Sequence, residues 1–300
     1  MLCFLGALER APNLKWLQIA WVGVDFPFMR PLLETGNDDH KQFVITNAAG
    51  TNAQPIATSV MAGILALHRR LNLLLFAQRE SRWIDKRHMP PRQDIQGKTV
   101  LIFGFGAIGR KVGLLCKAFE MKVIGVQRST VDTEALASAD EIIHPNQLEQ
   151  VIAQADFVVV ACPLTHETES KFDAEMLARM KPDSFLLNVG RAAVVDEEAL
   201  LDSLRRGAQR LPKEHLRLSG VADSSIHAGG IAGAYIDVFS TEPLPSSSEL
   251  WQLPNVIVSP HDSQTCVDND ARVQKIFIDN MTRFLHDEKL KNQVWPDSPS

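Results

Sequence analysis

The feature that most constrains this chain is a turn with regularly spaced glycines at residues 104–109. An apolar, β-branched run at residues 99–103 leads into the spacing G-x-G-x-x-G, and a helix-compatible pattern follows at residues 110–119. In a dinucleotide-binding fold, the first glycine makes the tight turn, the second lets the backbone approach a pyrophosphate, and the third lets the helix lie close to the strand. The N-terminus of such a helix attracts phosphates with its unpaired N–H groups. The turn therefore predicts a dinucleotide site that includes Gly104, Gly106, Ala107, Ile108 and Gly109.

Length, composition and charge exclude several classes of protein. The 300 residues suggest about two domains, and the net charge of -5 argues against a partner that is a nucleic acid. No apolar run has the length of a membrane span, so we expect no membrane partner. Four scattered cysteines without a C-x-x-C pair indicate neither a metal site nor a disulfide framework, and they favour a cytoplasmic location.

Apolar strand-like segments alternate with single helical segments after the glycine turn. Strands are expected at residues 122–126, 157–161, 184–189, 233–239 and 256–259. This alternation predicts an α/β fold with a doubly wound parallel sheet of the Rossmann type. The connection at residues 208–230 is far longer than the roughly 2–6 residues usual for such loops, and we interpret it as an insertion at the sheet edge opposite the active site.

The N-terminal part predicts a second, smaller α/β domain. Short strands are expected at residues 1–5, within 14–24 and at 43–46. Apolar positions at helical spacing across residues 54–80 predict one long helix that links the domains. We expect a substrate domain that comprises residues 1–88 and 264–300, and a dinucleotide-binding domain at residues 89–263.

The residues after the second expected strand of the nucleotide-binding domain bear on the choice of cofactor. An acidic residue about 20 positions beyond the glycines would bind the ribose hydroxyls of NAD. Here Gln127, Arg128 and Ser129 stand near that place. An arginine can form charge-assisted hydrogen bonds to a 2′-phosphate, and Ser129 can assist it. These residues favour NADP, with NAD as the alternative; a solvated surface arginine is the other interpretation of Arg128.

Three charged residues follow successive expected strands, where open α/β sheets bind their ligands: Arg191, Glu242 and His261. An arginine can bind a substrate carboxylate through two parallel hydrogen bonds. A histidine exchanges a proton near neutral pH, and a carboxylate beside it orients the ring. The set suits hydride transfer to a small 2-keto acid, with His261 as the proton donor. Taken singly, each residue also has a purely structural interpretation.

Five ordered motifs resemble the D-isomer-specific 2-hydroxyacid dehydrogenase family. They are Gly97-Lys98-Thr99-Val100 with the glycine turn, Ala161-Cys162-Pro163-Leu164-Thr165, Leu187-Asn188-Val189-Gly190-Arg191, Ala234-Tyr235-Ile236-Asp237-Val238-Phe239 and Ser259-Pro260-His261. The resemblance implies a Rossmann domain and a smaller flavodoxin-like domain with the active site between them. It also implies the glyoxylate and hydroxypyruvate reductase branch, which prefers NADP.

The resemblance assigns roles to individual residues. It implies that Arg191 binds the substrate carboxylate, that Glu242 supports the acid–base His261, and that the backbone of Gly23 and Val24 meets the substrate. Asp237 is expected to contact the nicotinamide carboxamide. Further cofactor contacts are expected from the residues that match the motifs, namely Cys162, Pro163, Thr168, Val189, Arg191 and His261.

Two alternatives and two further expectations follow. A non-catalytic dinucleotide-sensing binding protein has the same fold, and an NAD-dependent D-lactate or phosphoglycerate enzyme is disfavoured by Arg128. The chain begins inside the family's substrate domain, so we expect that domain to be truncated at its N-terminal side. The arm at residues 81–97 resembles the family's dimerisation region and predicts a homodimer.

Overall fold

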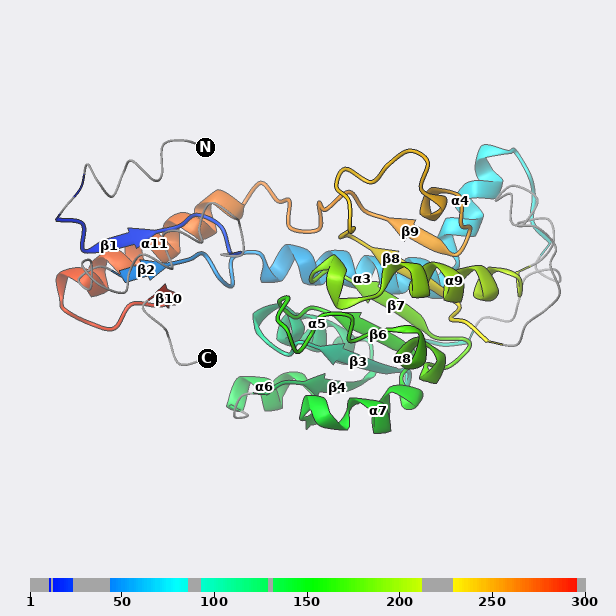
Figure 1. Ribbon diagram of the computed structural model, residues 1–300, viewed down its shortest axis with the longest axis horizontal. Helices are drawn as coiled ribbons and strands as arrows, with labels where there is room; N and C mark the ends of the chain where they lie inside the picture. Colours follow the sequence, from blue (N-terminus) through cyan, green and yellow to red (C-terminus); the bar gives the residue numbers. More distant parts are fainter. Residues whose placement is uncertain are drawn as a thin grey trace. The chain divides into compact units, whose positions relative to one another are not determined.

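The computed structural model describes residues 11, 13–23, 44–85, 93–128, 132–211 and 229–295. Contacts group the chain into two compact units, Ala53–Gln264 and, separately, Met1–Asn52 with Thr265–Ser300 (Figure 1). The expected strand at residues 1–5, most of the insertion at residues 208–230, and the candidate residues Val24 and Ser129 lie outside the described residues.

The larger unit is built on a seven-stranded sheet in which every pair of neighbouring strands is parallel. The strand order is β5-β4-β3-β6-β7-β8-β9. The strands are β3 (Thr99–Phe103), β4 (Lys122–Val126), β5 (Glu141–Ile143), β6 (Phe157–Val160), β7 (Phe185–Asn188), β8 (Gly233–Ile236) and β9 (Val256–Val258). The predicted doubly wound parallel sheet is confirmed. β5 was not expected.

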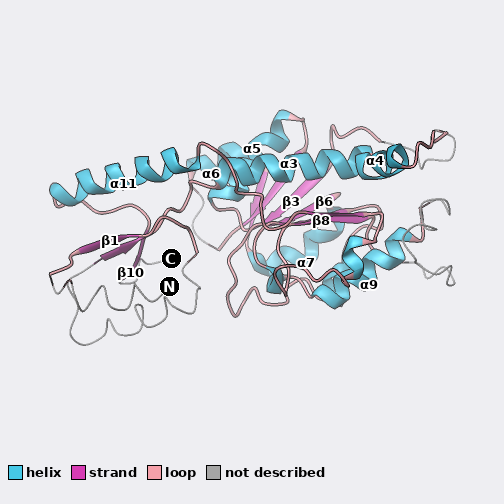
Figure 2. Ribbon diagram, turned by 90° about the horizontal axis from the view of Figure 1, so that it is seen from above, coloured by secondary structure: helices cyan, strands magenta, loops and turns pink. Residues whose placement is uncertain are grey.

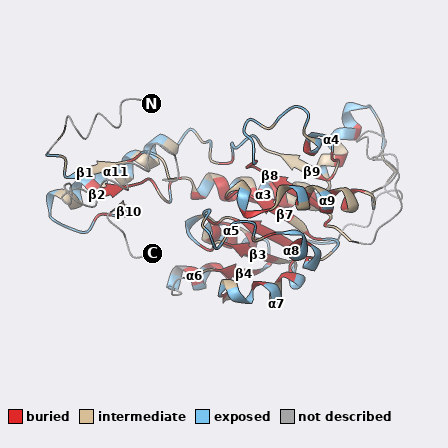
Figure 3. Ribbon diagram, viewed as in Figure 1, coloured by how far each residue is buried: buried red, intermediate tan, exposed pale blue. Residues whose placement is uncertain are grey.

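Helices cover both faces of this sheet, and an apolar core lies under each layer. Side chains alternate along a strand, so Leu101 and Phe103 of β3 belong to one core while Val100 and Ile102 belong to the other. The first core includes residues of α8 (Ala174–Arg179) and α9 (Glu197–Ala208), and the second includes residues of α3 (Ala53–Arg69) and α5 (Ala107–Ala118). The smaller helices are α6 (Thr133–Ser138) and α7 (Leu148–Val151). Figure 3 shows strands such as β3 and β8 as largely buried, whereas β9 at the end of the sheet is of intermediate burial.

The single helix expected at residues 54–80 is in fact two helices, so that prediction is wrong in this respect. α3 ends at Arg69, and α4 (Leu71–Arg79) follows it directly (Figure 2). The two helices are bent by 71°, and Figure 1 shows α4 turning away from the line of α3. Arg70 between them has a left-handed backbone with φ 58°, which ends the α-helical path. No single helix of the described chain is long and apolar enough to cross a membrane. Taken together, α3 and α4 reach the necessary length and apolar composition, but as a bent pair.

α3 lies against the sheet of the larger unit. Gly63 allows this approach, because a Cβ there would come within 2.9 Å of the ring of Tyr235 in β8. The contacts therefore group residues from Ala53 onward with the nucleotide-binding sheet. The functional division of the chain at residue 88 stays a prediction.

The smaller unit carries a three-stranded sheet in the order β1-β2-β10. β1 (Trp16–Gln18) and β2 (Val44–Thr46) are parallel, and β10 (Gln293–Trp295) is antiparallel to β2. Trp16 stacks on Phe277 and Phe284 of α11 (Asn269–Leu285). The buried Asn280 of the same helix donates to Gln18 and to the backbone of Lys291. This unit is thus an α/β arrangement too.

Candidate active site

The glycine turn closes tightly at the carboxyl end of β3. Gly104 has φ +100°, and a Cβ on it would lie 2.5 Å from the backbone nitrogen of Cys162. The N–H groups of Gly104 and Phe105 donate to the carbonyl of Val126, at 3.2 and 3.0 Å. By contrast, a Cβ on Gly106 would meet nothing within 4 Å. The turn therefore has open space beside Gly106, just before α5 begins, which fits the approach of a pyrophosphate.

A groove of about 590 Å³ extends from this turn along the carboxyl ends of β4, β5 and β6. It is lined by six of the predicted cofactor residues, which are Gly104, Gly106, Arg128, Cys162, Pro163 and Thr168. It is also lined by residues that the sequence analysis did not single out, among them His144, Asn146, Glu167 and Lys171. The first two follow β5, whose only sequence signal is the short apolar pair Ile142-Ile143. The groove is of the size usual for small-molecule sites.

Arg128 and Glu167 form an ion pair at the groove. Arg128 follows β4, Glu167 belongs to the loop after β6, and the distance from Nη1 to Oε2 is 2.5 Å. Both side chains are exposed, at 57% and 66%. The arginine that we expected to bind a 2′-phosphate therefore lines the groove but contacts a carboxylate of this chain.

Hydrogen bonds within the loop hold the loop that contains Thr168. The Thr168 hydroxyl accepts the N–H of Thr165 at 2.8 Å and donates to the carbonyl of Pro163 at 2.9 Å. Burial raises the pKa of the neighbouring Cys162 thiol to about 12, and the charge of Arg191 offsets this only in part. Cys162 therefore stays a neutral thiol and acts as a wall of the groove.

Glu242 and His261 meet at the same edge of the sheet, beyond β8 and β9. Nδ1 of His261 lies 2.8 Å from Oε2 of Glu242, and the other carboxylate oxygen accepts the N–H of Phe239 at 3.0 Å. Glu242 is thus held by the backbone and in turn orients the imidazole. The contact occupies Nδ1, so Nε2 is the ring nitrogen that can exchange a proton with a substrate.

The electrostatics of this pair include Arg191, which follows β7. Burial raises the pKa of the Glu242 carboxyl, but the hydrogen bonds from His261 and Phe239, together with the charges of His261 and Arg191, hold it below its ordinary value. Glu242 is therefore ionised at neutral pH. The guanidinium of Arg191 donates to the carbonyl of Gly190 at 3.0 Å, and the Asn188 amide donates to the carbonyl of Arg191 at 3.3 Å.

Asp237 anchors the segment that carries His261. Its buried carboxylate accepts the hydroxyl of Ser259, the N–H of Asp262, and both the N–H and the hydroxyl of Ser263. These four bonds surround His261, which has a left-handed backbone with φ 54°. The contact between Asp237 and a nicotinamide stays a prediction. Ser259 and Ser263 were not recognised as the partners of Asp237, although both lie within two residues of the predicted histidine.

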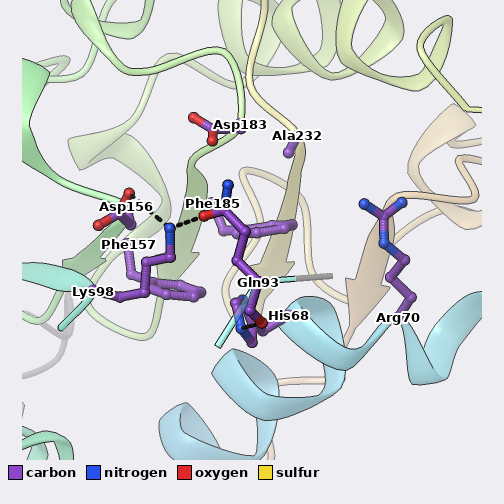
Figure 4. A pocket seen from close by; sticks show the side chains of 9 residues that line it. All are labelled: His68, Arg70, Gln93, Lys98, Asp156, Phe157, Asp183, Phe185 and Ala232. Carbon is purple, nitrogen blue, oxygen red and sulfur yellow. Dashed lines mark hydrogen bonds and ion pairs between the residues drawn. The ribbon is translucent and has the colours of Figure 1, made fainter. Parts of the chain in front are cut away.

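The opposite, amino edge of the sheet has a smaller pocket of about 110 Å³ (Figure 4). Figure 4 shows Lys98 between Asp156 and Gln93, with the ammonium 3.9 Å from the aspartate. Asp156 also pairs with Lys181 at 2.9 Å. Burial, aided by the charges of Lys98 and Arg69, lowers the pKa of His68 there despite its bond to the Gln93 carbonyl. Lys98 and Lys181 thus both pair with Asp156 at this edge, whereas the predicted catalytic residues lie at the carboxyl edge.

The other candidate residues are placed as follows. Val189 is buried directly after β7. Ala107, Ile108 and Gly109 form the first turn of α5. Gly23 belongs to the smaller unit.

Comparison with known proteins decides the family. Residues 61–211 and 224–263 match the model described as D-isomer specific 2-hydroxyacid dehydrogenase, NAD binding domain. The chain belongs to the D-isomer specific 2-hydroxyacid dehydrogenase family. It is 30% identical over 294 residues to glyoxylate/hydroxypyruvate reductase B of Pectobacterium carotovorum, an alignment that covers 96% of this chain and 81% of that protein.

Solved structures of the same family agree with this assignment. A family member from Aeromonas salmonicida is 31% identical with a TM-score of 0.73, over 97% of this chain and 82% of that one. A D-isomer specific 2-hydroxyacid dehydrogenase from Xanthobacter autotrophicus, solved with NADPH and MES, is 29% identical with a TM-score of 0.74, over 97% and 81%. The chain is thus an NAD(P)-dependent 2-hydroxyacid dehydrogenase, and the expected resemblance is confirmed. The enzyme interpretation is favoured over a non-catalytic binding protein.

Proposed function

We propose that this dehydrogenase reduces a small 2-keto acid of the glyoxylate or hydroxypyruvate type with NADPH, and that Arg191, Glu242 and His261 are its catalytic residues. The observation that carries the proposal is the 2.8 Å contact between His261 Nδ1 and Glu242 Oε2 at the carboxyl edge of the sheet. The Pectobacterium carotovorum relative, named glyoxylate/hydroxypyruvate reductase B, supports the substrate class.

Each of these residues has a separate role in the proposed reduction. A dinucleotide held at the glycine turn of Gly104 and Gly106 would supply the hydride for the keto carbon. Arg191 binds the substrate carboxylate through charge-assisted hydrogen bonds. Nε2 of His261 gives a proton to the keto oxygen as the hydroxyl forms, and the ionised Glu242 favours the imidazolium that holds this proton. Gly23 and Val24 bind the substrate through their backbone.

The residues that line the groove favour a dinucleotide with a 2′-phosphate as the cofactor. Arg128 lines it after β4, at the place where an NAD-specific enzyme carries a carboxylate. We propose that the pyrophosphate lies at the glycine turn, with Ala107, Ile108 and Gly109 in the helix that receives it. Arg128 and Ser129 bind the 2′-phosphate. The Xanthobacter autotrophicus relative was solved with NADPH, which agrees with this choice.

We also propose a homodimer that assembles through α4 and the arm after it. Large apolar side chains are exposed there, namely Leu71, Leu75, Phe76 and Trp83, the last at 95%. Such a patch on one element marks an interaction surface. A cytoplasmic location agrees with the three described cysteines, all of which are free.

Steady-state oxidation of NADPH and of NADH, each with glyoxylate, hydroxypyruvate and pyruvate, tests the proposal. We expect turnover with the first two acids and a higher kcat/KM with NADPH. His261→Gln should lower kcat by at least about 100-fold, and His286→Gln, at the end of α11, is the matched control. Absence of turnover with every acid, or a His261→Gln variant as active as the control, would contradict it.

A further inference from the structure

The ion pair between Arg128 and Glu167 crosses the proposed cofactor groove. β4 and β6 flank β3 in the sheet. Arg128 follows β4 and Glu167 follows β6, so their contact spans the carboxyl end of β3, where the glycine turn lies. Both residues line the groove together with Gly104 and Gly106. The pair therefore stands where a dinucleotide would pass.

The carboxylate of Glu167 and a 2′-phosphate would compete for the same donors. A guanidinium presents its N–H groups as a planar fork that suits either anion. Within the described chain, the Glu167 carboxylate has Arg128 as its ion-pair partner. At 57% and 66% exposure the pair is solvated, and exposed pairs of this kind are weak enough for a phosphate to displace. Once displaced, Glu167 leaves a negative charge beside the bound phosphate.

We propose that Glu167 is a specificity-determining residue, which binds Arg128 in place of a 2′-phosphate and thereby weakens the preference for the phosphorylated dinucleotide. The inference rests on the proposed role of Arg128 in binding NADP. Glu167 does not act on unphosphorylated dinucleotides, because these do not need Arg128. Removal of its charge should strengthen NADPH binding and leave NADH binding unchanged.

Two adenosine nucleotides that differ only in the 2′-phosphate test this inference without catalysis. Calorimetry would give the Kd of adenosine 2′,5′-bisphosphate and of adenosine 5′-monophosphate for the full-length protein. The variants are Glu167→Gln, Arg128→Gln and the double variant. Glu169→Gln is the matched control, because Glu169 is an exposed glutamate of the same loop and its replacement changes the net charge equally.

Glu167→Gln should tighten bisphosphate binding by about two- to fivefold and leave monophosphate binding unchanged. Glu169→Gln should change neither Kd. When Arg128 is already replaced by Gln, Glu167→Gln should tighten bisphosphate binding by a smaller factor, as expected for coupled residues. The inference is overturned if Glu167→Gln leaves the bisphosphate Kd unchanged, or if it tightens both nucleotides alike.

The same data separate this inference from the NADP proposal. Wild-type protein that binds the bisphosphate better than the monophosphate supports the NADP proposal whatever Glu167 does. If the wild type shows no preference and Glu167→Gln creates one, the NADP proposal fails for the native chain while the inference on Glu167 holds. If neither protein shows a preference, both are wrong.

Discussion

Glu242 connects the backbone of Phe239 to the ring of His261, with one carboxylate oxygen on each. The imidazole is therefore oriented by a side chain that is itself fixed at 3.0 Å to a backbone N–H. This arrangement leaves Nε2, the nitrogen that we propose transfers the proton, in a defined direction, as general acid catalysis requires.

Loss of the Glu242 charge should slow the reaction. In Glu242→Gln the amide keeps a similar shape but no longer holds the imidazole through a charged oxygen. We expect kcat for keto acid reduction to fall by about 10- to 100-fold. Glu198→Gln, an exposed glutamate of α9, is the control and should keep the wild-type kcat. A Glu242→Gln variant as active as wild type would refute the role of the pair.

The lowered pKa of Glu242 also predicts a pH-dependent stability. A carboxyl whose folded pKa lies below its unfolded value stabilises the fold above the unfolded pKa, and this stability is lost as pH falls through the folded pKa. The difference in Tm between wild type and Glu242→Gln should therefore be present at neutral pH. It should shrink below about pH 5, towards the ordinary carboxyl pKa and beyond. A Tm difference that grows in acid would contradict this assignment.

Ser263→Ala should loosen the segment that holds His261. The change removes the hydroxyl that donates to Asp237 and leaves one buried carboxylate oxygen without its partner. We expect the free energy of unfolding to fall by about 1–3 kcal/mol, with a lower kcat and little change in dinucleotide affinity. Thermal denaturation would measure the loss of stability, and separate determination of kcat and of KM for the dinucleotide would measure the kinetic effect. Thr58→Ala, which removes an exposed hydroxyl bond within α3, should leave kcat unchanged.

Alanine should lower stability at one glycine of the turn and cofactor affinity at another. Gly104→Ala combines φ +100° with a Cβ 2.5 Å from a backbone nitrogen, so we expect a loss of more than about 2 kcal/mol of stability. Gly106→Ala meets open space in the protein, and its Tm should stay near that of wild type. Its methyl group would instead stand where we propose the pyrophosphate, and dinucleotide affinity should fall. Equal dinucleotide affinity in Gly106→Ala and wild type would place the pyrophosphate elsewhere.

The homodimer proposal predicts that a charge on α4 separates the protomers. Leu75 is 59% exposed, and Leu75→Lys should yield a monomer by light scattering where the wild type yields a dimer. Val267, 98% exposed outside this patch, provides Val267→Lys as a control that should stay dimeric. A wild-type monomer would exclude the proposal.

The sequence was most informative where local pattern and tertiary environment agree. The strand at residues 122–126 was predicted at its observed bounds, because the apolar run between charged Lys122 and polar Gln127 is buried on both faces of a parallel sheet. The bend at Arg70 was not predictable, since neither glycine nor proline stands there. It coincides with a tertiary contact, in which the Asn72 amide on α4 donates to the carbonyl of Pro254 at 2.6 Å.

In the candidate site, too, some residues could be predicted from local sequence pattern and others depend on tertiary structure. The glycine turn has fixed spacing, so Gly104 and Gly106 could be placed in the groove from sequence alone. Glu167 could not, because its partner Arg128 lies 39 residues away in the chain. Only the order of strands β4, β3 and β6 brings their loops to the same groove.

The left-handed backbone of His261 has a cost in stability at the residue that we propose as the proton donor. At φ 54° a side chain is disfavoured by roughly 1 kcal/mol relative to glycine. The hydrogen bond to Glu242 offsets that cost in the folded protein, so a His261→Gly protein would relieve the backbone strain and lose this bond at the same time. Attempts to stabilise this enzyme by library screening should keep residue 261 fixed, because a screen for heat resistance measures only the balance of these two effects and not the proton transfer that we propose for the imidazole.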